Sequence, residues 1–327
     1  MIVCIFAVSV LAKPLNNAQI RGLFFYQVAQ GYAMTKQPKT IQEMMTLLVE
    51  ERGLDITGFS EFSTVLLDCN YYRLSGYFRA FQIDPSHGNN RFRNGTHIKD
   101  FMIPYLMDEQ LRLLILRGTS SLEQTLRAHF AYYLAQNEGA YSYTDLSSFK
   151  TIKYPDGTEA REVLIENIHK WLERSSEVCI RHYRNNNEPI PIWAAVEAMP
   201  FDTLSKMISL HTNTTAVDEL NQSLSLGKNR QRAAQIIHSM VYLRNICSHH
   251  CRLWNREIVL PPPVLDATAE RYGSYAYEDR SVWKSLIVLM DLIDGIKKNS
   301  TYSSMLIKQA ESNDDYFWGL CHPKRWH

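Results

Sequence analysis

The 327-residue sequence has little net charge, no closely paired cysteines and almost no strand-like alternation. Its 35 basic and 34 acidic residues give a formal net charge of +1, so binding to nucleic acid would require a local basic patch. The six cysteines are scattered and form no Cys-x-x-Cys pair. This pattern is typical of reduced thiols rather than of a disulfide framework. We therefore expect a cytoplasmic protein.

Long apolar runs are also scarce, and the one at the N-terminus does not predict a membrane span. Residues 1–12 are apolar, but they lack the basic start of a secretory signal and are too short to cross a bilayer. A second start is visible at Met34, and helical patterning begins just after it. We interpret residues 1–33 as an extension from a misassigned start codon, with a signal peptide as the alternative, and expect no membrane association.

Helical periodicity, in contrast, is frequent along the sequence. Thr40 and Glu43 form a capping box that opens a helix at Ile41, and Gly53 is a plausible stop. Further helices are expected over 59–68, 98–137 with a break near Gly118, 159–183, 193–211 with a kink or break at Pro200, 228–254 and 281–298. Residues 85–96 are expected to form a loop. These patterns predict an all-α bundle, divided into an N-terminal helical region (34–97) and a helical domain (98–327).

An aromatic stretch lies between the first helices, at residues 71–81. Its tyrosines and phenylalanines could stack unpaired RNA bases. We favour the alternative that Tyr72, Phe78 and Phe81 build core and that Gly76 allows close helix approach.

The polar chemistry is concentrated in the run Arg244-Asn245-Ile246-Cys247-Ser248-His249 and its continuation to Arg256. If the helix continues to residue 254 and beyond, Asn245, His249, Arg252 and Arg256 share one stripe, which His238 extends upstream. Histidine can move a proton near neutral pH, and arginine can stabilise the charge of a pentacoordinate phosphate. This stripe therefore suits metal-independent cleavage of RNA by the 2′-hydroxyl of the ribose.

The spacing of Arg244 and His249 poses a geometric problem. Five residues apart, they diverge by about 140° on a regular helix. They can serve one phosphate if Arg244 reaches round the helix, if the helix is distorted, or if a second copy completes the site. The last option predicts a homodimer.

Two other interpretations of the motif remain open. Arg244 and His249 could make buried polar bonds that hold helices together. Cys247, His249, His250 and Cys251 could instead bind zinc, although such ligands usually sit on turns. We favour neither and predict no metal or other cofactor.

Several blocks of sequence resemble the Abi-like abortive-infection proteins (the AbiD/AbiF group), which belong to the HEPN superfamily of helical ribonuclease domains. The blocks are 36–38 with 53–54, 71–77, 191–197 with 204–206, 244–256 and 318–326. Together they extend the resemblance over residues 34–327. Pro200 within the third block and residues 1–33 depart from the family pattern.

The resemblance implies a HEPN-like bundle that cleaves RNA in phage defence, with Arg244 and His249 catalytic and Asn245 between them. Some HEPN families also carry a Glu-x3-Lys/Arg pair, which Glu123 and Arg127 match, although an ordinary ion pair explains that spacing equally well. The further residues expected to bind RNA or support the site are His250, Arg252 and Arg256.

The resulting prediction is an endoribonuclease with an RNA substrate, acting as a homodimer and restrained by a small-RNA or protein antitoxin. The alternative is a HEPN-like dimer that binds RNA or protein without cutting. A zinc-stabilised regulatory protein is a third possibility.

Overall fold

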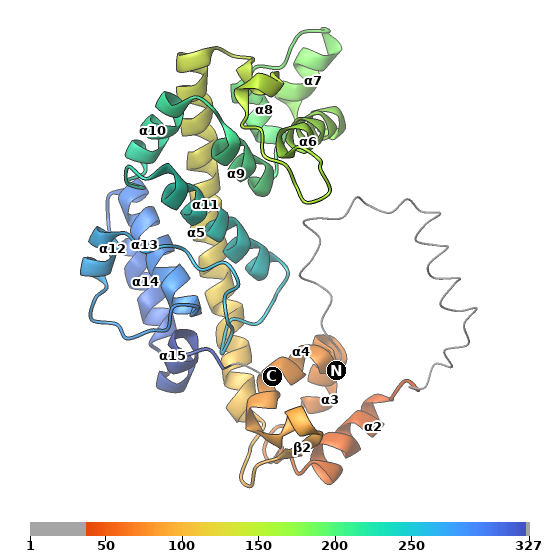
Figure 1. Cartoon of the computed structure of the whole chain (residues 1–327). Helices are drawn as coiled ribbons and strands as arrows, with labels where there is room; N and C mark the ends of the chain where they lie inside the picture. Colours follow the sequence, from red (N-terminus) through yellow and green to blue (C-terminus); the bar gives the residue numbers. More distant parts are fainter. Residues whose placement is uncertain (1–36, 325–327) are drawn as a thin grey trace.

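The structure, a computed structural model, describes residues 37–324 and has the expected all-α fold (Figure 1). The expected extension over 1–33 lies outside the described residues. Within residues 37–324 the only strands are β1 (Gln82–Asp84) and β2 (Asn89–Phe92), which form an antiparallel hairpin. This hairpin occupies part of the region expected to be a loop.

One long helix, α5 (Lys99–Glu138), is the axis of the molecule. Its 40 residues extend for about 60 Å. It packs against α8 (Ile192–Ala198), α10 (Thr214–Ser223), α11 (Arg230–Ser248), α13 (Val282–Lys297) and α14 (Thr301–Ala310). Every helix that carries a candidate site residue therefore contacts α5 or belongs to it.

The expected break in α5 near Gly118 is absent. Gly118 is buried inside a continuous helix, and a Cβ at this position would overlap the ring of Tyr302 from α14. The Tyr302 hydroxyl donates a hydrogen bond to the carbonyl of Leu114, 3.1 Å away. Gly118 allows α14 to approach α5 closely, and it does not interrupt α5.

The N-terminal helices lie at one end of α5 (Figure 1). The predicted capping box is confirmed at the start of α2 (Ile41–Thr46), which continues as a π-helical turn over Leu47–Glu51 before Gly53 at φ +77°. Helices α3 (Phe62–Cys69) and α4 (Tyr71–Phe78) follow. Phe78 is buried, but Tyr72 is 75% exposed, so the expectation that Tyr72 builds core is wrong.

The opposite end of α5 carries α6 (Ala160–Arg174), α7 (Val178–Asn185) and α8. The helix expected over 159–183 is therefore interrupted at residues 175–177. The break expected at Pro200 is confirmed, because Pro200 is the N-cap of α9 (Phe201–Leu210). The short helices α12 (Asp266–Arg271), α14 and α15 (Asp314–Cys321) were not predicted.

Candidate active site

The motif helix α11 ends earlier than expected, at Ser248. His249 is the C-cap residue, and its backbone N–H still donates to the Asn245 carbonyl at 3.0 Å. His250 then adopts a left-handed conformation, with φ +53°. Asn245 and His249 thus remain on one helical face, whereas Arg252 and Arg256 follow the helix in irregular chain. The predicted four-residue helical stripe is wrong beyond His249.

Two backbone bonds close the helix after Ser248. The N–H of His250 donates to Cys247 and that of Cys251 donates to Ile246, at 3.0 and 2.9 Å. This pattern is the Schellman motif, in which glycine usually occupies the left-handed position. Histidine occupies it here, so no glycine in the sequence marked the helix end.

A buried carboxylate on α5 fixes the chain that follows. Asp108 is fully buried and accepts hydrogen bonds from the backbone N–H groups of Leu253 (2.6 Å) and Trp254 (3.1 Å). It also accepts from the hydroxyls of Tyr77 (2.6 Å) and Tyr316 (2.7 Å). Burial raises the pKa of Asp108, and these four donors oppose that shift by stabilising the charged form.

Arg112, one helical turn from Asp108, completes this anchor. Its guanidinium lies 4.0 Å from the Asp108 carboxylate and donates to the Cys251 carbonyl at 3.2 Å. Sequence reasoning missed both residues. The available signal was a charged pair at i and i+4 that falls in helical phase with the apolar residues Tyr105 and Ile115.

Arg252 and Arg256 bond to the backbone of their own loop. Arg252 donates to the Trp254 carbonyl at 2.6 Å, and Arg256 donates to the Arg252 carbonyl at 3.3 Å. Burial lowers the pKa of Arg252. His250 is exposed, and its carbonyl accepts a hydrogen bond from Arg73 of α4.

Arg244 meets the Glu123–Arg127 pair predicted from the sequence. The Glu123 carboxylate lies 2.5 Å from Nη2 of Arg127 and 3.9 Å from Nη2 of Arg244. Arg127 also donates to the Val196 carbonyl of α8. The Arg244 guanidinium lies over the ring of Phe201, 5.7 Å from its centroid, and its buried Nε has no hydrogen-bond partner among the described residues. Helices α5 and α11 thus supply one half-buried cluster of two arginines and one carboxylate, which contacts Val196 of α8 and Phe201 of α9.

Arg244 and His249 themselves are not brought together within the chain. Helix α11 is regular through Ser248, so no distortion of the helix brings the two side chains together. Arg244 turns towards α5 and α9, whereas His249 is exposed at the helix end, and no hydrogen bond or ion pair among the described residues joins them. Asn245 is half-buried beside them.

The motif offers no group of metal ligands. Across residues 37–324 no three His, Cys, Asp or Glu side chains gather where they could hold a metal ion. Cys247 is buried, and burial raises the pKa of its thiol, which disfavours the thiolate that zinc requires.

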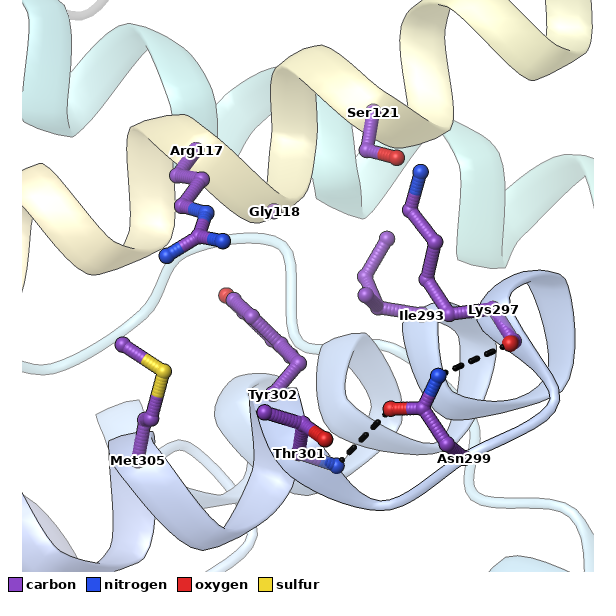
Figure 2. Close-up of a pocket in the computed structure, with 9 residues that line it drawn as sticks. All are labelled: Arg117, Gly118, Ser121, Ile293, Lys297, Asn299, Thr301, Tyr302 and Met305. Atoms are coloured by element: carbon purple, nitrogen blue, oxygen red, sulfur yellow. Dashed lines mark hydrogen bonds between the residues drawn. The ribbon is translucent and has the colours of Figure 1, made fainter.

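A separate cavity of about 260 Å³ lies between α5 and α13–α14 (Figure 2). Arg117 of α5 and Lys297 of α13 extend towards it from opposite sides, and Tyr302 of α14 lies between them. None of the motif residues lines it. In the described part of the chain, no helix is both long enough and apolar enough to cross a membrane.

Comparison with known proteins identifies the family. A family model described as Abi-like protein matches residues 64–255. The chain belongs to the Abi-like protein family. No curated protein and no solved structure matches it.

The Abi-like match begins in α3 and ends one residue after Trp254, so it contains Glu123, Arg127, Arg244 and His249. It also contains Asp108 and Arg112, which anchor the loop behind the motif. Membership of the Abi-like family connects the chain with abortive infection, a form of phage defence.

Proposed function

We propose that this Abi-like protein is a metal-independent endoribonuclease of phage defence, with a HEPN-type bundle and a site completed by a second copy. The observation that carries the proposal is the placement of Arg244 in a cluster with Glu123 and Arg127, while His249 is exposed at the end of the same helix. Two guanidinium groups share one carboxylate, so the cluster keeps a net positive charge that suits a phosphate.

The reaction needs only groups that the chain and the RNA supply. The ribose 2′-hydroxyl attacks the adjacent phosphorus, the bond to the 5′-oxygen breaks, and a 2′,3′-cyclic phosphate forms. His249 moves the proton from the 2′-hydroxyl or to the leaving oxygen. Arg244 stabilises the additional negative charge on the phosphate oxygens, and Asn245 donates a hydrogen bond to the same group.

The proposed dimer would bring an Arg244 and a His249 together although they diverge within one chain. Within one chain the two side chains point to different sides of α11, so a two-fold partner can bring its histidine to the other chain's arginine. A small-RNA or protein antitoxin that covers the exposed His249 would restrain such a site. We further propose that the enzyme acts in the cytoplasm.

The direct test is cleavage of total RNA in EDTA. We expect the wild-type protein to cut, and Arg244→Ala and His249→Ala each to lose at least about a hundredfold of the rate. The matched control is His169→Ala, which removes an exposed histidine of α6. The products should end in 2′,3′-cyclic phosphates.

Three results would contradict parts of the proposal. Loss of cutting in EDTA would exclude the metal-independent mechanism, and unchanged cutting by both variants would exclude the site. RNA binding without any cutting by the folded wild-type protein would favour a binding module.

A further inference from the structure

A polar cavity lies where α9, α10 and the first turn of α11 meet, far along α11 from His249. Its volume is about 390 Å³, within the range of small-molecule sites. Its polar lining comprises Lys150, Ser209, His211, Thr214, Asn221, Arg230 and Gln231. Two of these side chains, His211 and Asn221, are only 2% exposed.

Asn221 has an entirely unpaired amide. Neither its Nδ2 nor its Oδ1 has a hydrogen-bond partner among the described residues, although both atoms are buried. Leaving a buried polar group without a hydrogen bond is energetically unfavourable. A binding partner that offers one donor and one acceptor side by side would satisfy this amide.

His211 adds a second unpaired donor. Its Nδ1 accepts a hydrogen bond from the backbone N–H of Asn213 at 3.1 Å, which places the ring proton of the neutral form on Nε2. That Nε2 lies 3.4 Å from a carboxylate oxygen of Glu138 but makes no hydrogen bond. Burial lowers the pKa of His211, and the nearby Lys150 acts in the same direction against Glu138, so the ring stays neutral near pH 7.

The mouth of the cavity is positively charged. Lys150 is exposed and uses one of its three N–H donors on the Ser209 carbonyl, at 3.0 Å. Arg230 is held by Asp218 through Nε and Nη2, both at 2.6 Å. Lys150 therefore keeps free donors for an anion, while Arg230 is largely neutralised by its partner.

We propose that this cavity binds a nucleotide, with the base edge on Asn221 and His211 and the phosphate on Lys150. An asparagine amide pairs through two hydrogen bonds with adenine N6 and N7, so an adenine nucleotide is the best fit. Asn221 and Lys150 line one cavity, the first with an unpaired amide and the second with N–H donors to spare, which matches a ligand that is uncharged at one end and anionic at the other.

The nucleotide can come from solution or from an RNA strand. A wider groove of about 590 Å³ shares Ser209, Gln231 and Ala234 with this cavity and continues along α11 past His238. His238 lies seven and eleven residues before Asn245 and His249, on the same helical face. Binding of an RNA strand at this cavity rests on the proposed function. Binding of a free nucleotide does not, because it does not require the protein to be a nuclease.

Calorimetric titration of the full-length protein tests the site. AMP should bind, and inorganic phosphate should bind about tenfold more weakly, because it lacks the base edge. Asn221→Leu should weaken AMP binding about tenfold while keeping the fold, since it removes an unsatisfied amide. Lys150→Ala should weaken it similarly, whereas the matched control Lys153→Ala, an exposed lysine of the same loop, should not.

A second titration distinguishes an RNA strand from a free nucleotide as the ligand. A short oligoadenylate is titrated into His249→Ala, which cannot cut it, with and without Asn221→Leu. Dependence of the oligomer's affinity on Asn221 supports an RNA source, and dependence for AMP alone supports a free nucleotide. The proposal is overturned if neither probe binds, if Asn221→Leu and Lys150→Ala leave both affinities unchanged, or if Arg244→Ala abolishes AMP binding. None of these results depends on whether the wild-type protein cuts RNA.

Discussion

At the scale of single residues, Glu123 is the centre of the candidate site. One carboxylate oxygen lies 2.5 Å from Arg127 and the other 3.9 Å from Arg244. Arg127 is fixed further by the Val196 carbonyl, so the pair forms a rigid support for the Arg244 guanidinium. Glu123 is therefore a positioning residue in the proposed reaction, and it does not need to touch the RNA.

Glu123→Gln tests this role. The amide keeps the shape of the side chain but cannot hold two cations, so Arg244 loses its orientation. We expect kcat for RNA cleavage to fall about ten- to a hundredfold with little change in KM. The matched control is Glu109→Gln, which makes the same change at an exposed carboxylate of α5, away from the cluster.

A merely structural role for Glu123 predicts a different outcome. In that case Glu123→Gln would lower the free energy of unfolding and would still reduce activity in the Arg244→Ala background. If Glu123 acts through Arg244, the double variant should be no slower than Arg244→Ala alone.

At the scale of helices, local signals predicted starts better than ends. The capping box at Thr40 and the break at Pro200 are both present, because each depends on side chains within one turn of the boundary. The end of α11 depends on a histidine at φ +53°, and the chain that follows it is held by Asp108, which is 145 residues away from Leu253 in sequence. Only the folded chain brings that carboxylate to the loop.

At Gly118 the sequence predicts a helix end that the structure does not have. Its low helix propensity suggested a break in α5, but packing against Tyr302 outweighs propensity. The periodicity of the sequence cannot show that a tyrosine from α14 lies on this turn.

Gly118→Ala should therefore destabilise the protein even though alanine is the better helix former. The added Cβ overlaps the Tyr302 ring, and overpacking of this kind costs about 1–3 kcal/mol, against roughly 0.5–1 kcal/mol gained in propensity. The matched control is Gly295→Ala in α13, where a Cβ meets nothing within 4 Å, and it should stabilise the protein. Urea unfolding of both variants measures the difference. Equal stabilisation by the two substitutions would contradict the close packing of α14 on α5.

At the scale of the whole molecule, the sequence predicts the individual residues of the candidate site but not the contacts between them. One short motif predicts Arg244 and His249 as site residues, and helical spacing predicts the pair of Glu123 and Arg127. That Glu123 meets Arg244 follows from the packing of α11 on α5, across 121 residues of sequence. The helical stripe through Arg252 and Arg256 was wrong because it assumed that the helix continued.

The separation of Arg244 and His249 leads to a prediction about subunits. If each active site takes its arginine from one chain and its histidine from the other, a mixed dimer of Arg244→Ala and His249→Ala has one intact site and one site without either residue. When equal amounts of the two variants exchange subunits, about half of all dimers are mixed. Each mixed dimer has one intact site where a wild-type dimer has two, so the mixture should recover about a quarter of wild-type activity.

The measurement is RNA cleavage by the two inactive variants, first alone and then after mixing under conditions that allow exchange. Mixing either variant with itself is the control. If every chain builds its own site, the mixture stays inactive, because no chain then carries both residues. Recovery therefore requires both a dimer and a site shared across its interface, which is the arrangement that we propose for Arg244 and His249.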